Sequence, residues 1–282
     1  MDQIKLYNGQ YAPTLAYGTW LIPNDKAANC VKMALEAGYR HIDTAQAYQN
    51  EEGVGQGIKE SGLKREEIYI TTKVQAELKT YKEAKASIDE SLRKLGVDYV
   101  DLILIHCPQP WKEFRSEKRY FKENIEVWKA LEEAYEEGKV KAIGVSNFLV
   151  DDLENIMKNC KIKPMANQIL CHIGNTPIDV IKFCQMNDIV VEAYSPIAHG
   201  RALADKSIEK FAKKYGVSVA QLCIKYTLQL NTISIPKASS KEHIVDNTKL
   251  NFVISDEDMM ELIKLNEIDY GEDKFWPVFN KR

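Results

Sequence analysis

The sequence lacks the features that mark membrane-spanning, secreted and nucleic-acid-binding proteins. No run approaches the roughly 18 consecutive apolar residues that a membrane span needs. The first residues, Met1–Leu6, contain no apolar segment of the secretory type. With a net charge of −3, the chain has no basic stripe that could neutralise phosphates. We therefore expect a soluble cytoplasmic protein without nucleic-acid or membrane partners.

The sequence also lacks paired cysteines. It contains six cysteines but no C-x-x-C pair, so it predicts neither a zinc knuckle nor a disulfide framework. We expect reduced thiols that lie mostly in the core. They are Cys30, Cys107, Cys160, Cys171, Cys184 and Cys223.

A dinucleotide fingerprint of the Rossmann type is missing as well. That fingerprint needs G-x-G-x-x-G in a tight turn directly after a strand. The one candidate, GVGQG at Gly53–Gly57, has a different spacing and follows a helix start at Asn50. We predict instead that these glycines allow a helix to pack closely against its neighbours.

What the sequence does contain is typical of a single α/β barrel. Its 282 residues, 45% hydrophobic and 28% charged, suffice to bury a large core, and we expect one domain over residues 1–282. Short β-branched runs alternate with amphipathic segments, which predicts a (β/α)8 TIM barrel. The expected strands are Leu15–Gly18, His41–Thr44, Ile68–Val74, Tyr99–His106, Val140–Ser146, Met165–Ile169, Ile189–Ser195 and Thr232–Pro236. The expected helices are Asp25–Ala37, Asn50–Glu60, Tyr81–Leu95, Ile125–Glu137, Asp151–Asn159, Pro177–Met186 and Ser218–Leu230.

Three segments fall outside this alternation. Ile4–Leu6, followed by an Asn-Gly pair and Tyr11, predicts a small β-hairpin that caps one end of the barrel. Pro108–Lys122 is expected to be a long loop after the fourth strand, and Tyr270–Arg282 an irregular aromatic tail. Long segments after strands are where such barrels build their sites.

Four polar residues stand at or just beyond the ends of three consecutive predicted strands: Asp43, Tyr48, Lys73 and His106. Taken singly, each has a better structural explanation, as a helix cap, a solvated lysine or a satisfied core histidine. Taken together they make chemical sense. An ammonium beside a phenol stabilises its phenolate, and a carboxylate holds the ammonium, so a Tyr, Lys and Asp relay can protonate a carbonyl oxygen.

A metal-dependent hydrolase is an alternative interpretation. His41, Asp43, His106 and His172 could bind Zn²⁺ and activate water. Lys73 at the centre of such a cluster would repel a cation, so we expect no metal.

Seven motifs in order resemble those of the aldo-keto reductase family: HIDTAQAYQNE, TTKV, LIHCP, GVSNF, NQI with His172, AYSPI and IPKASSKEHIVDN. The resemblance runs over nearly the whole chain. It implies NADPH-dependent reduction of an aldehyde or ketone to an alcohol, with Tyr48 as general acid, His106 orienting the carbonyl, and Asp43 and Lys73 completing the catalytic set. A non-enzymatic alternative is also known in this family, namely a cofactor-binding accessory subunit of a membrane channel.

The resemblance also implies an NADP(H) site across the barrel mouth. Ser146, Asn147 and Gln168 would bind the nicotinamide carboxamide, and Tyr194 would stack on the ring. Ser195, in the loop SPIAHGRAL, matches the region that covers the pyrophosphate. The adenosine end would be bound by Lys237, Ser239, His243 and Asn247, with Lys237 against the 2′-phosphate.

Departures from the family pattern affect the cofactor and the substrate. Many relatives carry Arg where this chain has His243, so the preference for NADPH over NADH is less secure and NAD(H) is an alternative as a weaker or dual cofactor. Cys107 stands where Trp is frequent, which predicts a smaller side chain in the pocket wall. Because Leu170 and Cys171 replace acidic and aromatic residues, we assign His172 a structural role. The expected substrate pocket contains Trp20, Cys107 and Trp111, with Phe275 or Trp276 from the tail.

The partner expected from these features is a small carbonyl compound. No obvious apolar patch or heptad demands a second chain, so we expect a monomer or a weak oligomer. The physiological substrate cannot be read from this pattern.

Overall fold

The fold is a closed barrel of parallel strands, seen in a computed structural model that describes residues 2–114 and 116–265. Within these residues, eight strands pair in chain order from β3 to β10, each parallel to the next. They are β3 (Tyr17–Gly18), β4 (His41–Asp43), β5 (Tyr69–Val74), β6 (Leu102–Ile105), β7 (Ile143–Ser146), β8 (Ala166–Leu170), β9 (Val190–Tyr194) and β10 (Ile233–Ile235). Backbone hydrogen bonds from Ala16 to Ser234 and from Gly18 to Pro236 join the two ends of this sheet. The predicted (β/α)8 barrel is confirmed.

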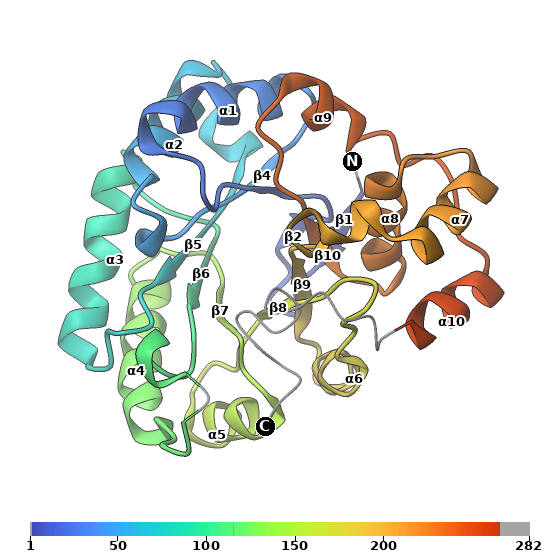
Figure 1. The fold of residues 1–282 in the computed structure, drawn as a ribbon. Helices are drawn as coiled ribbons and strands as arrows, with labels where there is room; N and C mark the ends of the chain where they lie inside the picture. The colour runs from blue at the N-terminus through green and yellow to red at the C-terminus, as the bar shows by residue number, and fades with distance from the viewer. Residues whose placement is uncertain (1, 115, 266–282) are drawn as a thin grey trace.

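Helices surround the strands on the outside (Figure 1). They are α1 (Asn24–Glu36), α2 (Glu51–Glu60), α3 (Tyr81–Leu95), α4 (Phe121–Glu136), α5 (Val150–Asn159), α6 (Ile178–Met186), α7 (Lys206–Tyr215), α8 (Val219–Gln229), α9 (Lys241–Asp246) and α10 (Asp256–Lys264). Capping explains several boundaries. The hydroxyl of Thr80 accepts a hydrogen bond from the backbone of Glu83 at the start of α3, and Gly96 ends that helix with a φ of 66°. The sequence did not predict α7, α9 and α10.

Most strands are shorter than the apolar runs that predicted them, and β3 and β6 are examples. Leu15 forms only an isolated bridge with Ser234, and Val100 only an isolated bridge with Val140. Both residues are buried, so the apolar run extends beyond the continuous ladder of β3 and of β6. Hydrophobicity therefore marks the buried segment and not the length of the ladder.

The glycines of α2 allow close helix packing, as predicted. A Cβ atom added to Gly53 would lie 2.2 Å from the carbonyl oxygen of Asn24 in α1. One added to Gly55 would lie 2.1 Å from the carbonyl oxygen of Leu95 in α3. Because real side chains do not approach backbone atoms so closely, α2 can contact both neighbours only with glycine at these positions.

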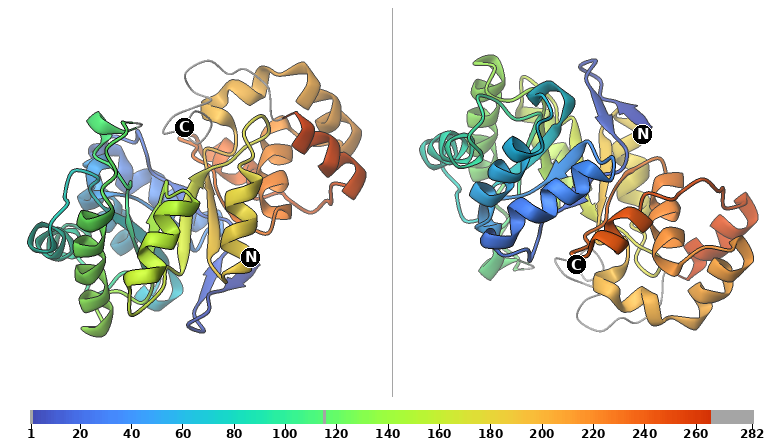
Figure 2. Two further views of the ribbon diagram at one scale, coloured as in Figure 1. Left: turned by 90° about the horizontal axis from the view of Figure 1, so that it is seen from below. Right: turned by 90° about the horizontal axis from the view of Figure 1, so that it is seen from above.

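The N-terminal hairpin, β1 (Gln3–Lys5) and β2 (Tyr11–Pro13), closes the end of the barrel where the parallel strands begin. It turns at Gly9, whose φ is 91°. The hydroxyl of Tyr7 donates to the carbonyl oxygen of Lys163, and the amide of Asn8 donates to that of Lys141, in the segments that precede β8 and β7. The hairpin projects from this end in Figure 2. The predicted cap is confirmed.

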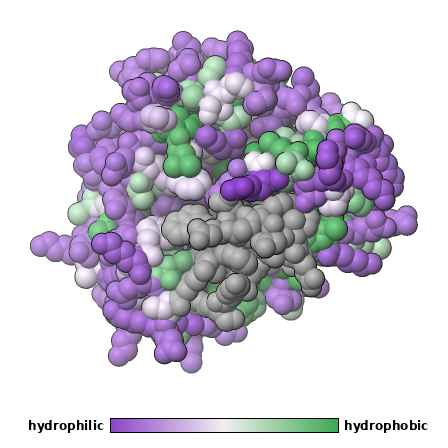
Figure 3. Space-filling model, in the orientation of Figure 1, coloured by the Kyte–Doolittle hydropathy of each residue, from purple (hydrophilic) through white to green (hydrophobic). Residues whose placement is uncertain are grey.

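The hydrophobic core fills the space between strands and helices, and a smaller cluster joins η4 (Ala198–Ala204) with α7, α8 and α10. Five cysteines are buried and Cys160 is half-buried, all as free thiols. Hydrophilic residues dominate the periphery of the face shown in Figure 3. No helix in the described part of the chain is long and apolar enough to cross a bilayer.

Candidate active site

A cavity of about 620 Å³ opens at the carboxyl ends of the strands. Asp43, Ser146 and Tyr194 end β4, β7 and β9, and all three line this cavity. Barrel enzymes place their chemistry at this end, because the strand ends and the loops that follow them converge there. Its lining comprises Gly18, Trp20, Leu21, Asp43, Ala47, Tyr48, His106, Trp111, Ser146, Asn147, Gln168, Tyr194, Ser195, Pro196, Ile197, His199, Gly200, Ile235 and Lys237.

A fully buried lysine organises one wall of the cavity. Lys73 Nζ lies 2.8 Å from Asp43 Oδ1 and 2.9 Å from Asp43 Oδ2, and it donates to the carbonyl oxygen of Thr44 at 2.8 Å. It also lies 3.3 Å from the hydroxyl oxygen of Tyr48. The adjacent strands β4 and β5 supply the ion pair, and the short helix η1 (Gln46–Tyr48) brings the phenol back over it.

Burial and charge keep Tyr48 and Lys73 protonated. Surrounding protein atoms shield the phenol from bulk water and raise the pKa of Tyr48, although the Lys73 ammonium partly opposes this effect. Burial alone would lower the pKa of Lys73, but the attraction of Asp43 and Tyr48 outweighs it, so that the pKa is raised. The result at neutral pH is a phenol that holds its proton beside a permanent positive charge.

His106 follows β6 and faces the same phenol. Its ring forms edge contacts with Tyr48, at 5.6 Å between centroids, and with Trp111, at 5.2 Å. Burial and the Lys73 charge lower the pKa of His106 well below its usual range, so the imidazole is neutral. Its Nδ1 is buried without a hydrogen-bond partner among the described residues. A neutral imidazole carries one N–H that can donate to an uncharged oxygen.

Three polar side chains form the opposite wall through hydrogen bonds to one another. The amide nitrogen of Asn147 donates to the carbonyl oxygen of His106 and to Ser146 Oγ, while its Oδ1 accepts from the hydroxyl of Tyr194 at 2.8 Å. Ser146 Oγ donates to the backbone oxygen of Gln168. Asn147 has a φ of 62°, a left-handed conformation that asparagine tolerates better than most residues. These hydrogen bonds hold the three side chains relative to one another.

The family model described as "Aldo/keto reductase family" matches residues 13–267. The chain belongs to the aldo/keto reductase family. It is 41% identical over 268 residues to a glyoxal reductase of Bacillus subtilis, which covers 94% of this chain and 93% of that protein. It is 37% identical over 289 residues to an aldehyde reductase of Saccharomyces cerevisiae, covering 94% of this chain and 91% of the other.

Solved structures agree with this assignment. An aldo-keto reductase from Bombyx mori, in complex with NADP, superposes with a TM-score of 0.86 at 34% identity and covers 96% of each chain. An aldo-keto reductase from a deep-sea metagenome library gives a TM-score of 0.87 at 38% identity, covering 94% of this chain and 95% of that chain.

The structure brings most of the sequence-predicted cofactor and pocket residues of this aldo/keto reductase to one cavity. Trp20, Trp111, Ser195 and Lys237 line it together with the residues described above. Ser195 adopts a φ of 52°, where the chain leaves β9 and turns over the mouth.

Other predicted residues lie away from the cavity lining. Cys107 is completely buried, and its carbonyl oxygen accepts a hydrogen bond from Lys79. Ser239 and His243 are exposed, and Asn247 is buried at the end of α9. Phe275 and Trp276 lie outside the described residues. His172 is buried with its Nδ1 2.8 Å from the carbonyl oxygen of Ile173, away from the cavity lining.

Sequence reasoning missed two residues at the site. His199 lines the mouth, with its ring 5.1 Å from that of Trp20. Glu192, in the middle of the apolar strand VVEAY, is completely buried beneath Gln168 and accepts a hydrogen bond from it. An acidic residue inside a run of buried strand residues is the signal that could have identified Glu192.

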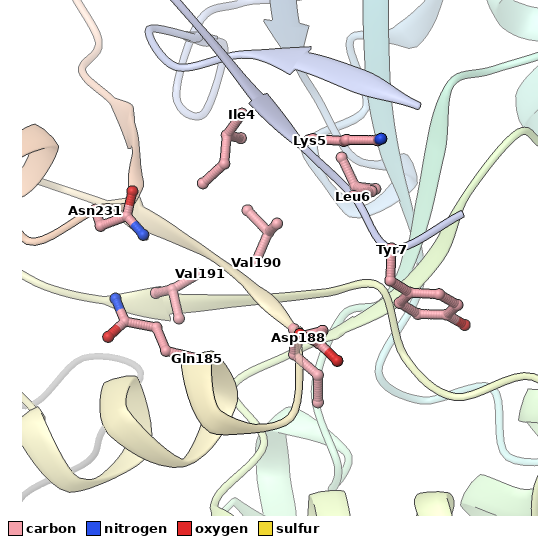
Figure 4. Close-up of a pocket in the computed structure, with 10 residues that line it drawn as sticks. Ile4, Lys5, Leu6, Tyr7, Gln185, Asp188, Val190, Val191 and Asn231 are labelled. Atoms are coloured by element: carbon pink, nitrogen blue, oxygen red, sulfur yellow. The ribbon is translucent and has the colours of Figure 1, made fainter. Parts of the chain in front are cut away.

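A second cavity, of about 410 Å³, lies at the other end of the barrel, between the N-terminal hairpin and the start of β9 (Figure 4). The polar groups at its edge are engaged with the fold itself. Tyr7 and Gln185 donate to the backbone oxygens of Lys163 and Leu230, and Asp188 pairs with Lys163. This second cavity is not bordered by any of the four predicted catalytic residues, Asp43, Tyr48, Lys73 and His106. The described residues contain no group of three or more His, Cys, Asp or Glu side chains that could hold a metal ion.

Proposed function

We propose that this protein reduces an aldehyde or ketone to an alcohol with NADPH as hydride source and Tyr48 as proton donor. The observation that carries the proposal is the contact between the buried Lys73 ammonium and the Tyr48 hydroxyl at the edge of a large cavity. A phenol held this way can donate a proton to a substrate oxygen and share the resulting negative charge with the ammonium.

The chain's own residues fit a nicotinamide cofactor. The second wall of the cavity offers amide groups, including the Gln168 side chain, that can bind a carboxamide. Lys237, exposed at another edge of the same cavity, supplies a positive charge for a phosphate. NADPH, when bound, supplies the hydride. The B. mori relative was solved with NADP, which supports this cofactor.

Each residue of the first wall has a separate task in this proposal. Tyr48 delivers the proton to the carbonyl oxygen, and Lys73 stabilises the phenolate that remains. Asp43 holds the ammonium in place through both carboxylate oxygens. The neutral His106 donates a hydrogen bond to the same carbonyl oxygen and fixes its orientation.

The substrate proposed is a small aldehyde, including 2-oxoaldehydes. Trp20, Trp111 and His199 give the cavity an aromatic wall, and no described residue of its lining other than Lys237 is a cation that would select a carboxylate substrate. Relatives named as glyoxal reductase and aldehyde reductase support this class.

Turnover of a panel of aldehydes, ketones and keto-sugars with NADPH and with NADH tests the proposal. Tyr48→Phe should lower kcat/KM by roughly 10²–10⁴-fold while NADPH binding persists, since general acid catalysis contributes that much. Tyr226→Phe is the matched control, because that buried hydroxyl contacts Thr176 away from the cavity. A parent protein that binds NADPH but turns over no carbonyl would favour the accessory-subunit alternative.

A further inference from the structure

The side chains of Gln168 and Glu192 form a buried hydrogen-bonded pair below the cavity. Gln168 on β8 and Glu192 on β9 are register partners in adjacent parallel strands. Gln168 Nε2 lies 2.8 Å from Glu192 Oε2 and 2.7 Å from Asp43 Oδ2. The glutamine amide therefore bridges two carboxylates on opposite sides of the barrel interior.

This bridge fixes which way the Gln168 amide faces. A primary amide nitrogen carries two protons, and each of the two carboxylates accepts one of them. The Asp43 carboxylate, paired with Lys73, cannot donate a hydrogen bond to the amide oxygen, so the reversed orientation would place that oxygen against an acceptor. The carbonyl oxygen of the Glu192 side chain can accept the other amide proton whether or not the carboxyl group carries a proton. Among the described residues nothing donates to Gln168 Oε1, and Gln168 borders the cavity. The amide oxygen is consequently left for a ligand.

We propose that Glu192 is a positioning residue that holds Gln168 with its amide oxygen toward the cavity, where that oxygen accepts an N–H of the nicotinamide carboxamide. This inference rests on the proposed function. Asp43 alone could accept only one amide proton from Gln168, and the side chain could then rotate. With both protons engaged, the acceptor is already in place when the cofactor enters, so no ordering cost is incurred at binding.

No neighbouring side chain among the described residues competes with Gln168 for a hydrogen bond to Glu192. His41 on β4 lies with Nε2 3.8 Å from Glu192 Oε1, beyond hydrogen-bond distance. His41 is instead engaged with Thr71 Oγ1 at 2.8 Å and with the carbonyl oxygen of Pro13. Glu192 Oε1 is buried without a partner in the described part of the chain. The hydrogen bond from Gln168 is thus the interaction that uses this carboxylate.

The test compares binding of NADPH with binding of 2′,5′-ADP, which shares the adenosine end but has no nicotinamide. Glu192→Leu removes the acceptor and should raise the Kd for NADPH roughly tenfold, the loss of one well-placed hydrogen bond, without changing the Kd for 2′,5′-ADP. Glu192→Gln keeps an amide oxygen that can accept from Gln168, so it should restore NADPH binding to within about threefold of the parent. Both constants are measured by fluorescence titration.

Glu51→Leu is the control for loss of a buried carboxylate, because Glu51 bonds Thr72 outside the cavity lining. If Glu192→Leu weakened the binding of NADPH and of 2′,5′-ADP equally, the substitution would have damaged the barrel in general, and the inference would be overturned. An unchanged Kd for NADPH, or a Glu192→Gln variant as defective as Glu192→Leu, would also overturn it. A parent protein that binds NADPH no more tightly than 2′,5′-ADP would show that the nicotinamide half adds no affinity. That result would overturn the proposed function, and this inference with it.

Discussion

The Nζ atom of Lys73 lies 3.3 Å from the hydroxyl oxygen of Tyr48, and within the described part of the chain Lys73 is the one side chain that forms a hydrogen bond with that hydroxyl. The contact links a residue near the end of β5 to a residue in the turn after β4. It places a positive charge where a phenolate would form. The proton-donating ability of Tyr48 should therefore depend on Lys73.

Lys73→Met should abolish carbonyl reduction over the whole pH range. Without the ammonium, burial and the charge of Asp43 act unopposed on the phenol, whose pKa rises further and whose conjugate base is no longer stabilised. We expect a loss of roughly 10²–10⁴-fold in kcat/KM, the size of a general acid contribution. This loss is measured as the pH profile of kcat/KM of parent and variant with an aldehyde that the parent reduces efficiently.

Lys73→Met also leaves the Asp43 carboxylate buried without its counter-ion, which can unfold the barrel. The double variant Asp43→Asn, Lys73→Met removes both charges and should fold while remaining inactive. A single variant that retained its maximal rate and only shifted its optimum would contradict the role given to Lys73.

Gly55→Ala should destabilise the barrel by roughly 1–3 kcal/mol or more, the cost of overpacking, although alanine favours helices. The added methyl group would lie 2.1 Å from the carbonyl oxygen of Leu95, so α2 and α3 would have to separate. Gln56→Ala on the exposed side of the same helix is the matched control. Urea unfolding of both variants decides it, and a Gly55→Ala protein as stable as the control would refute the packing argument.

Glu192 should make the folded protein less stable as the pH rises. Burial, reinforced by the charge of Asp43, raises the pKa of Glu192 from about 4.5 to about 7. Between these values the folded state binds more protons than the unfolded state, so the free energy of unfolding falls as pH increases through this window. Glu192→Gln removes this pH-dependent contribution. Between about pH 4.5 and pH 8, its free energy of unfolding should therefore rise by up to about 3 kcal/mol relative to that of the parent.

Other groups around Glu192 titrate in both proteins, so the comparison is made as a difference. Burial lowers the pKa of His41 to about 4, and Asp43 and Lys73 form the adjacent ion pair. Chemical denaturation of parent and variant at matched pH values gives the difference in unfolding free energy. A constant difference across the window would show that the pKa of Glu192 is the same in the folded and the unfolded protein.

The sequence predicted the barrel well because each strand is a short apolar run that must be buried on both faces. It located Asp43, Lys73 and His106 because polar residues at the ends of such runs are conspicuous. It failed for α7, α9 and α10, which follow β9 and β10. The last helix has an amphipathic pattern and a Ser255 cap, so the expectation of one helix per strand is what concealed it.

Glu192 shows a different limit of sequence reasoning. Its importance depends on Gln168 on β8 and Asp43 on β4, which are distant in sequence and meet only across the closed barrel. No periodicity reports such a contact. Cys107, next to His106, is completely buried and is not part of the cavity lining, so its expected role in the pocket wall stays a prediction.

Lys237 offers the sharpest test of cofactor choice, because it is exposed at the edge of the cavity and is its one cationic lining residue in the described part of the chain. If it pairs with the 2′-phosphate, Lys237→Ala should weaken NADPH binding by about ten- to a hundredfold, the worth of a charge-assisted contact, and leave NADH binding unchanged. Lys129→Ala, on the outer surface of α4 beside Glu126, is the matched control for loss of one charge. His243→Arg should act in the opposite direction, since a permanent guanidinium at a position that the family resemblance assigns to the adenosine end adds attraction for the phosphate. Fluorescence titration of both cofactors measures all three variants. Equal losses for NADPH and NADH in Lys237→Ala would place Lys237 against a group common to both cofactors, such as the pyrophosphate, and would remove the structural reason for preferring NADPH.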